Sequence, residues 1–254
     1  MRPGPGDDDF LEIELRSPKQ IAGRILVLSA VVRRVMIEHR YMAAKDSDQD
    51  IDETLFDLRA SLVLSGAEQE LTASERALLG APAGQMREDD LYDFGWEIEA
   101  LRAILATVGL TEALPVPPSL GDIRAMEAVV AGLDPSVARI AEALRLPDDE
   151  SAARSREIVE LWLWRASVER EIRESGPREQ RLLRAEVREV ATEAQHAGLV
   201  SITADGDFET GSQVIDQWAD EELAGFELAS HARLRALNWL CGLGITWEDT
   251  PVEV

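Results

Sequence analysis

The chain has 254 residues, of which 45% are hydrophobic, enough for one large core or two smaller ones. Its formal net charge of −23 argues against binding to nucleic-acid phosphates or anionic membranes, because both need clustered Lys and Arg. No apolar run approaches the roughly 20 residues of a membrane-spanning helix. Cys241 is the one cysteine, so no internal disulfide can form. These features favour a cytoplasmic protein.

The N-terminal residues predict a tail, a strand and then a helix. Residues 1–9 are rich in Pro, Gly and Asp, and we expect them to form a flexible tail. Over 10–15 apolar residues alternate with glutamates, which predicts a short strand with one buried face. Ser17-Pro18 with Gln20 then begins a helix whose apolar stripe continues to about residue 45.

Apolar stripes at helical spacing predict most of the remaining elements. A capping box at Thr72–Glu75 begins a short helix, and the stripe from Leu91 to Val108 predicts one long central helix. Three prolines make 115–118 the best place for an internal boundary. Further helices are expected near 51–66, 123–133, 137–146, 158–172, 183–198, 212–219 and 220–241.

These elements predict a mainly α-helical fold, a single irregular multi-helix domain over 10–254. A small antiparallel β element is expected to accompany the helices. It combines the N-terminal strand with a hairpin around 199–209 that turns at Asp205-Gly206.

Six blocks of the sequence, several of them with tryptophan, form a recognisable series: Arg16–Arg24, Trp96–Leu101, Leu161–Arg165, Gly206–Phe208, His231–Leu240 and Trp247–Thr250. In this order they resemble a bacterial family known as domain of unknown function 4272. The family often has Glu-Arg-His where this chain reads Ala232-Arg233-Leu234. The resemblance spans nearly the whole chain from Arg16 and implies a helical bacterial protein, without an established activity.

A charged residue on an apolar stripe is the most informative single feature. Arg165 lies among the apolar residues of its helix, and a buried charge must be paired. Glu97 and Glu99 are the predicted partners, either in a structural ion pair or in a ligand pocket. Asn238 is expected to bond a backbone group. The candidate pocket or buried polar cluster consists of Trp96, Glu97, Glu99, Arg165, Asn238, Trp239 and Asp249.

Catalytic, metal and cofactor sites are not predicted. Cys241 lies between Leu240 and Gly242 and resembles a small buried residue more than an activated thiol. The acidic run Asp46–Asp57 lacks the Gly and Glu that a calcium loop needs at its sixth and twelfth positions. Glu193–His196 is one Glu-x-x-His, whereas a di-metal bundle needs two.

The uneven charge predicts a possible partner surface. Nine arginines lie between Arg154 and Arg188, and none of the residues from Glu189 to Ala232 is Lys or Arg. This leads to a first interpretation, a non-catalytic interaction protein that binds a basic protein, as an immunity protein would. The alternative is an enzyme or small-ligand binder with a pocket near Trp96, Glu99, Arg165 and Asn238. The candidate partner surface consists of Asp216, Asp220, Glu221, Glu222 and Glu227.

Overall fold

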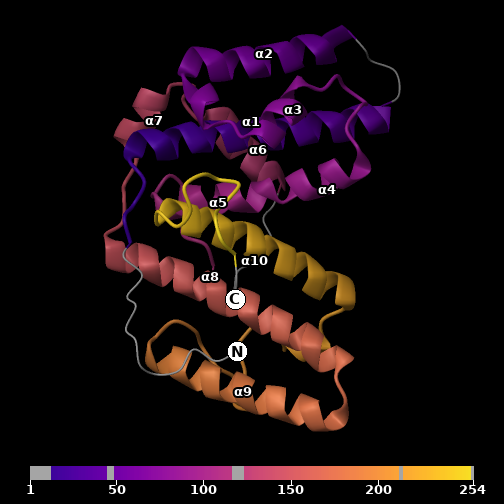
Figure 1. The fold of residues 1–254 in the computed structure, drawn as a ribbon, viewed down its shortest axis with the longest axis vertical. Coiled ribbons are helices and arrows are strands. Elements are labelled where there is room, and N and C mark those ends of the chain that lie inside the picture. The colour runs from indigo at the N-terminus through magenta and orange to yellow at the C-terminus, as the bar shows by residue number, and fades with distance from the viewer. Residues whose placement is uncertain (1–12, 45–48, 116–122, 212–213, 253–254) are drawn as a thin grey trace.

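The computed structural model describes residues 13–44, 49–115, 123–211 and 214–252. Within these ranges the fold is built from ten α-helices and two 3-10 helices (Figure 1). The α-helices are α1 (Pro18–Ala44), α2 (Gln49–Ser65), α3 (Ala73–Gly80), α4 (Glu88–Gly95), α5 (Glu97–Thr107), α6 (Ile123–Gly132), α7 (Val137–Ala143), α8 (Asp149–Glu174), α9 (Pro177–His196) and α10 (Asp220–Leu240). The 3-10 helices are η1 (Ala67–Glu70) and η2 (Ile215–Gln217).

Six of these helices are stacked in one column. From the top of Figure 1 the order is α2, α1, α5, α10, α8 and α9, and each helix contacts the next. The shorter elements η1, α3, α4 and α7 pack around α1. Segments far apart in the sequence therefore meet, because α10 lies between α5 and α8.

The core has a large upper part and a smaller lower part. The upper part is formed by α1, α5 and α10, with Leu28, Leu101 and Leu234 fully buried. The lower part surrounds Trp162 of α8, whose ring meets Phe208 and Phe226 edge to face at 5.2 and 5.9 Å between ring centres. Such aromatic pairs stabilise a core beyond the area that they bury.

Local sequence signals predict the starts of two helices correctly. At α1 the backbone N–H of Ser17 donates to Gln20 Oε1 over 3.1 Å. At α3 Thr72 Oγ1 accepts from the backbone N–H of Glu75 at 3.1 Å, and Glu75 Oε2 accepts from the backbone N–H of Thr72 at 2.9 Å. Each cap satisfies backbone donors that the first turn leaves unpaired.

The mainly α-helical class is correct, but the predicted antiparallel β element is wrong. Around 199–209 the described residues contain one isolated bridge, between Ile202 and Phe208. Three backbone bonds span this turn, but Asp207 is held by α8 and the arms are too short to form strands. Residues 10–12 lie outside the described ranges. Residues 13–15 form no strand, and Ile13 and Leu15 pack against the core while the chain bonds to the end of α10.

Two predicted helices also differ from the structure. The expected helix over 91–108 is divided into α4 and α5, which meet at Trp96. Gly95, a poor helix former, precedes the break, and the backbone N–H of Trp96 reaches Asp93 O at 3.4 Å. The helix expected over 212–219 is reduced to η2, and residues 212–213 lie outside the described ranges. The expected tail 1–9 and residues 116–118 of the expected boundary also lie outside them.

Among the described helices, none combines the length and the apolar character that are needed to cross a membrane.

Candidate functional site

A hollow of about 740 Å³ lies beside α4, where α4 and α5 face the C-terminal part of α1. Figure 1 shows α4 at the right of the view, below the C-terminal end of α1. We name this hollow the α4 groove. Two residues of the predicted cluster, Trp96 and Glu99, line it. The other lining residues are His39, Met42, Met86, Glu88, Leu91, Tyr92, Gly95 and Ile98.

The break between α4 and α5 shapes the wall of the α4 groove. Trp96 lies at the corner, and Tyr92 meets its ring edge to face with 6.1 Å between the ring centres. Tyr92 remains 57% exposed and Met42 48% exposed. The groove therefore presents aromatic and methionine side chains to solvent, and such surfaces commonly mark binding sites.

An adjoining hollow of about 620 Å³ extends the α4 groove along α1. The two hollows share His39, Gly95 and Ile98, and the second adds Met36 and Phe94. Together they give an elongated, largely apolar depression of the kind into which a helix can fit.

The floor and the rim of the α4 groove differ in charge. At the floor Glu99 Oε2 accepts from Arg233 Nε and Nη2 at 3.0 and 2.6 Å, and from Arg102 Nη1 at 3.1 Å. Burial lowers the pKa of Arg233, although Glu99 opposes this shift. Of the exposed acids of α4, Glu88 lines the groove, and Asp89 and Asp93 lie on the same helix outside its lining; none of the three makes a direct ion pair with the described residues. The floor is therefore compensated and the α4 side is negative, whereas Arg40, Arg124 and Glu127 line the adjoining hollow.

Arg165 is buried as predicted, at 1% exposed, but its predicted partners are wrong. Its Nε and Nη2 donate to Asp207 at 2.8 and 2.7 Å, and Nη2 also donates to Glu169 at 3.0 Å. α10 separates α8 from α5, so Glu97 and Glu99 pair with arginines of α10 instead. We name Arg165, Glu169, Asp207 and Arg173 the lower arginine cluster.

The other predicted residues lie in separate places. Glu97 accepts from Arg235 Nη2, and burial raises the pKa of Glu97. Asn238 donates to the backbone carbonyl of Pro251 at 2.7 Å and accepts from Arg156. Trp239 packs against Trp247, and Asp249 accepts from the backbone and side chain of Thr246. The structure therefore does not gather the seven residues into one pocket.

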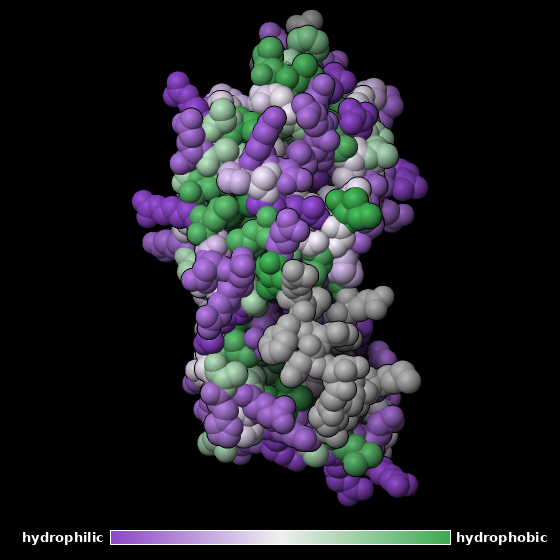
Figure 2. Space-filling view, turned by 60° about the vertical axis from the view of Figure 1, so that its left-hand side comes forward, coloured by the Kyte–Doolittle hydropathy of each residue, from purple (hydrophilic) through white to green (hydrophobic). Residues whose placement is uncertain are grey.

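Most of the candidate partner surface is paired within the chain. Asp220 accepts from Arg173 at 2.6 Å, Glu227 from Arg170 at 2.9 Å, and Asp216 lies 3.9 Å from Arg184. These arginines come from α8 and α9, which pack beside the acidic segment, a proximity that charge counts along the sequence do not show. Glu221 and Glu222 are exposed and make no ion pair with the described residues. Figure 2 shows hydrophilic side chains over much of the face that it draws, with hydrophobic patches between them.

Sequence reasoning missed several buried polar residues around Trp247. Trp247 is 5% exposed and lies between the guanidinium groups of Arg24 and Arg235. The signal was present, because Arg24 lies on the apolar stripe of α1 as Arg165 does on that of α8. Arg34, paired with Glu38 on the same helix, is a second example.

The thiol of Cys241 and the distribution of metal-ligand side chains can be described directly. Burial raises the pKa of the Cys241 thiol to about 11, which keeps it protonated at neutral pH. Groups of three or more His, Cys, Asp or Glu that could hold a metal are not found in the described part of the chain.

A family model described as Domain of unknown function (DUF4272) matches residues 7–194. The match contains the Arg16–Arg24, Trp96–Leu101 and Leu161–Arg165 blocks, and it ends before the His231–Leu240 block. No curated protein and no solved structure matches the chain.

Proposed function

The chain belongs to the DUF4272 family, and we propose that it is a non-catalytic binding protein whose α4 groove holds a basic amphipathic helix of a partner protein. The observation that carries this proposal is the combination of an exposed apolar groove with the unpaired acids of the adjacent helix α4, of which Glu88 lines the groove. The apolar side chains would bury the hydrophobic face of the helix, and the rim would meet its basic residues.

The chemistry of the lining supports a helix more than a rigid small molecule. Met36, Met42 and Met86 are flexible and adapt to irregular apolar surfaces. The two adjoining hollows also form one elongated depression, which suits the spaced apolar anchors of a helix. The acids Glu88, Asp89 and Asp93 add a net negative field in a chain of charge −23, which would speed association with a basic partner.

The test uses two fluorescent synthetic peptides, each an amphipathic helix with leucine on one face. One carries lysine on the polar face and the other carries glutamate. We expect fluorescence anisotropy to detect binding of the lysine peptide, which weakens as the salt concentration rises, and no binding of the glutamate peptide.

Variants at exposed positions connect this binding to the α4 groove without disturbing the fold. Tyr92→Ser combined with Met42→Ser should weaken binding of the lysine peptide at least tenfold, because central apolar anchors dominate such interfaces. Leu182→Ser is the matched control, since Leu182 is 65% exposed on α9 and distant in the helix column. If the double variant and the control bind the peptide equally well, the groove is not the binding site.

The acidic surface that begins α10 is the second candidate. The observation in its favour is that Glu221 and Glu222 are exposed without an ion pair in the described residues. Changing both to Lys should abolish peptide binding if this surface is used. Changing Glu88 and Asp89 to Lys should do so if the groove rim is used, so the two pairs of variants separate the candidates.

A further inference from the structure

A smaller cavity, independent of the α4 groove, lies where α1, η1, the start of α3 and the C-terminal segment meet. Its volume is about 230 Å³. This is room for about seven water molecules and is smaller than a typical drug-sized pocket. Arg24 and Trp247 line it and are 1% and 5% exposed. We name it the Trp247 cavity.

Arg24 and Trp247 are held against each other and each retains an unused donor. The guanidinium carbon of Arg24 lies 4.5 Å from the centre of the Trp247 ring. Arg24 Nη1 donates to the backbone carbonyl of Glu70 at 3.1 Å, and Nη2 donates to Glu75. The N–H groups of Arg24 Nε and Trp247 Nε1 have no acceptor among the described residues. Buried donors without acceptors are unfavourable, so an acceptor placed here would be bound firmly.

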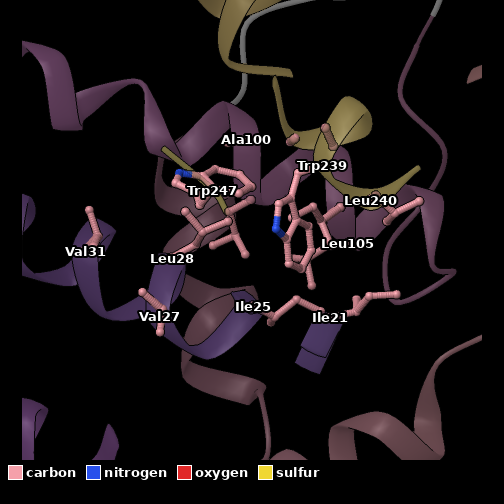
Figure 3. Packing of buried hydrophobic residues seen from close by; sticks show 14 of the residues in the cluster. Ile21, Ile25, Val27, Leu28, Val31, Ala100, Leu105, Trp239, Leu240 and Trp247 are labelled. Atoms are coloured by element: carbon pink, nitrogen blue, oxygen red, sulfur yellow. The ribbon is translucent and has the colours of Figure 1, made fainter. Parts of the chain in front are cut away.

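The C-terminal segment is fixed firmly enough to form one wall of the Trp247 cavity. Arg16 Nε donates to the carbonyl of Trp239 at 3.1 Å, and Arg16 Nη2 donates to that of Gly244. Figure 3 shows the rings of Trp239 and Trp247 beside each other, close to Leu28 and Ile25 of α1. The guanidinium of Arg16 therefore bonds to backbone carbonyls of the C-terminal segment, whereas Arg24 keeps one N–H, that of Nε, without an acceptor among the described residues.

A carboxylate lies on another side of the same cavity. Glu70 is half-buried, and its side chain packs closely against the backbone of Gly23. A Cβ at Gly23 would lie 2.7 Å from Glu70 Cγ, so only glycine leaves room for this contact. Burial raises the pKa of Glu70, against the attraction of Arg24, Arg16 and Lys19. A buried carboxyl group in a cavity is a candidate functional group.

The charges of the Trp247 cavity decide the kind of ligand. Arg16 and Arg24 contribute two positive charges, and Glu70 and Glu248 contribute two negative charges. A multiply charged anion would be repelled by the two carboxylates, and a simple cation would leave the donors of Arg24 and Trp247 unused. A small neutral molecule with both an anionic and a cationic group satisfies both sides.

We propose that the Trp247 cavity binds a small zwitterion of the free amino-acid type. Its carboxylate accepts from Arg24 Nε and Trp247 Nε1, and its ammonium group donates to Glu70. The donors explain the anionic half of the ligand, and the half-buried carboxylate explains the cationic half.

The test is thermal unfolding of the full chain with free glycine, alanine, serine and leucine at millimolar concentration. A ligand that binds the folded state raises the Tm in proportion to its occupancy. We expect at least one free amino acid to raise the Tm, while its N-acetyl derivative and its methyl ester do not. If no free amino acid raises the Tm, or if the two blocked derivatives act equally well, the proposal is wrong.

Two variants assign the binding to this cavity. Glu70→Gln should weaken amino-acid binding about tenfold or more, because a charge-assisted bond is lost. Glu68→Gln, exposed on the same η1 and outside the cavity, should bind like the parent. Trp247→Phe keeps a ring and removes one donor, and it should also weaken binding. A Glu70→Gln variant that binds an amino acid as tightly as the parent would overturn the assignment, whether or not Trp247→Phe folds.

Discussion

Two buried arginines on apolar helix stripes, Arg165 of α8 and Arg24 of α1, end in different surroundings. Both are 1% exposed. Arg165 is held by two carboxylates, those of Asp207 and Glu169. Arg24 bonds directly to one carboxylate, that of Glu75, and its other direct contacts are a backbone carbonyl and the face of Trp247, while Glu70 and Glu97 lie close enough to interact with its charge. Two carboxylates therefore accept from Arg165 and one accepts from Arg24, and Trp247, which has an orphaned donor of its own, lies against Arg24.

The lower arginine cluster fastens a loop to a helix. Asp207 binds Arg165 through both oxygens, and its Oδ1 also accepts from the backbone N–H of Phe208 at 2.7 Å. The loop that was predicted as a hairpin is thus fixed by side-chain bonds to α8 rather than by pairing between strands. Arg165 Nη1 and Trp162 Nε1 on the same helix also have no acceptor in the described residues, but Trp162 does not line the hollow beside Arg165, whereas Trp247 and Arg24 line one cavity together.

The largest expected effect tests the structural role of the lower arginine cluster. Arg165→Ala would leave Asp207 and the buried Glu169 without their main counter-ion, and we expect the free energy of unfolding to fall by about 3–5 kcal/mol. Urea unfolding measures this change. Arg170→Ala is the control, because Arg170 is 60% exposed and its pair with Glu227 should contribute less than about 1 kcal/mol. Equal effects of the two substitutions would show that the ion pairs of Arg165 do not stabilise the fold more than an exposed pair does.

A smaller effect tests how tightly the wall of the Trp247 cavity is fixed. Gly242 and Gly211 both have positive φ, 83° and 88°, so alanine is strained at either position. A Cβ at Gly242 would also lie 2.4 Å from the carbonyl oxygen of Glu14, whereas one at Gly211 would meet nothing within 4 Å. We expect Gly242→Ala to lower the free energy of unfolding by about 1–3 kcal/mol more than Gly211→Ala, because the backbone must shift.

Equal losses of stability from the two glycine substitutions would contradict this picture. They would show that the backbone of the segment that carries Trp247 shifts at little cost in free energy, so that this segment is not a rigid wall of the cavity. Thermal unfolding of both variants beside the parent gives the comparison directly, and the Tm of Gly242→Ala should be the lowest of the three.

Local signals predicted much of the fold and little of the candidate sites. The family and the helical class were predicted correctly, and so were the Ser17 and Thr72 caps, since they depend on neighbouring residues. The pairing of Arg165 was predicted wrongly because it depends on the stacking order, in which α10 lies between α8 and α5. The α4 groove exists because the chain breaks at Trp96, and apolar periodicity continues through that break.

Charge counts along the sequence likewise do not show which acids pair across the fold. The acidic segment from Glu189 to Ala232 has no arginine of its own, but α8 and α9 supply Arg170, Arg173 and Arg184 across the fold. The unpaired acids that remain on α4 come from a region where the sequence shows no unusual charge contrast. Long-range packing therefore decides which charges are left for a partner.

The smallest expected effect is a pH dependence in the buried group around Trp247. Glu97 has a raised pKa because burial disfavours its charged form, although Arg235 and Arg24 oppose the shift and Glu75 adds to it. As the pH rises above about 4.5, the ordinary pKa of Glu, the unfolded chain loses this proton first. The folded parent still holds it, so the parent should lose stability relative to Glu97→Gln until the pH passes the folded pKa. Urea unfolding of both proteins across this range measures the difference.

Asp148→Asn, at the start of α8, is a control that should respond with the opposite sign. Hydrogen bonds from the side chain and backbone of Ser151 lower the pKa of Asp148, so the folded parent releases this proton first as the pH rises. The parent should therefore gain stability relative to Asp148→Asn as the pH rises towards 3.8, the ordinary pKa of Asp, and lose that advantage as the pH falls.

If the stability difference between the parent and Glu97→Gln stays constant with pH, the carboxyl of Glu97 is ionised and fully compensated by Arg235. The charges of Glu97, Arg235 and Arg24 around Trp247 would then balance, as the charges of the lower arginine cluster do. The contrast between the two buried arginines would in that case rest on the unused donors of Arg24 and Trp247.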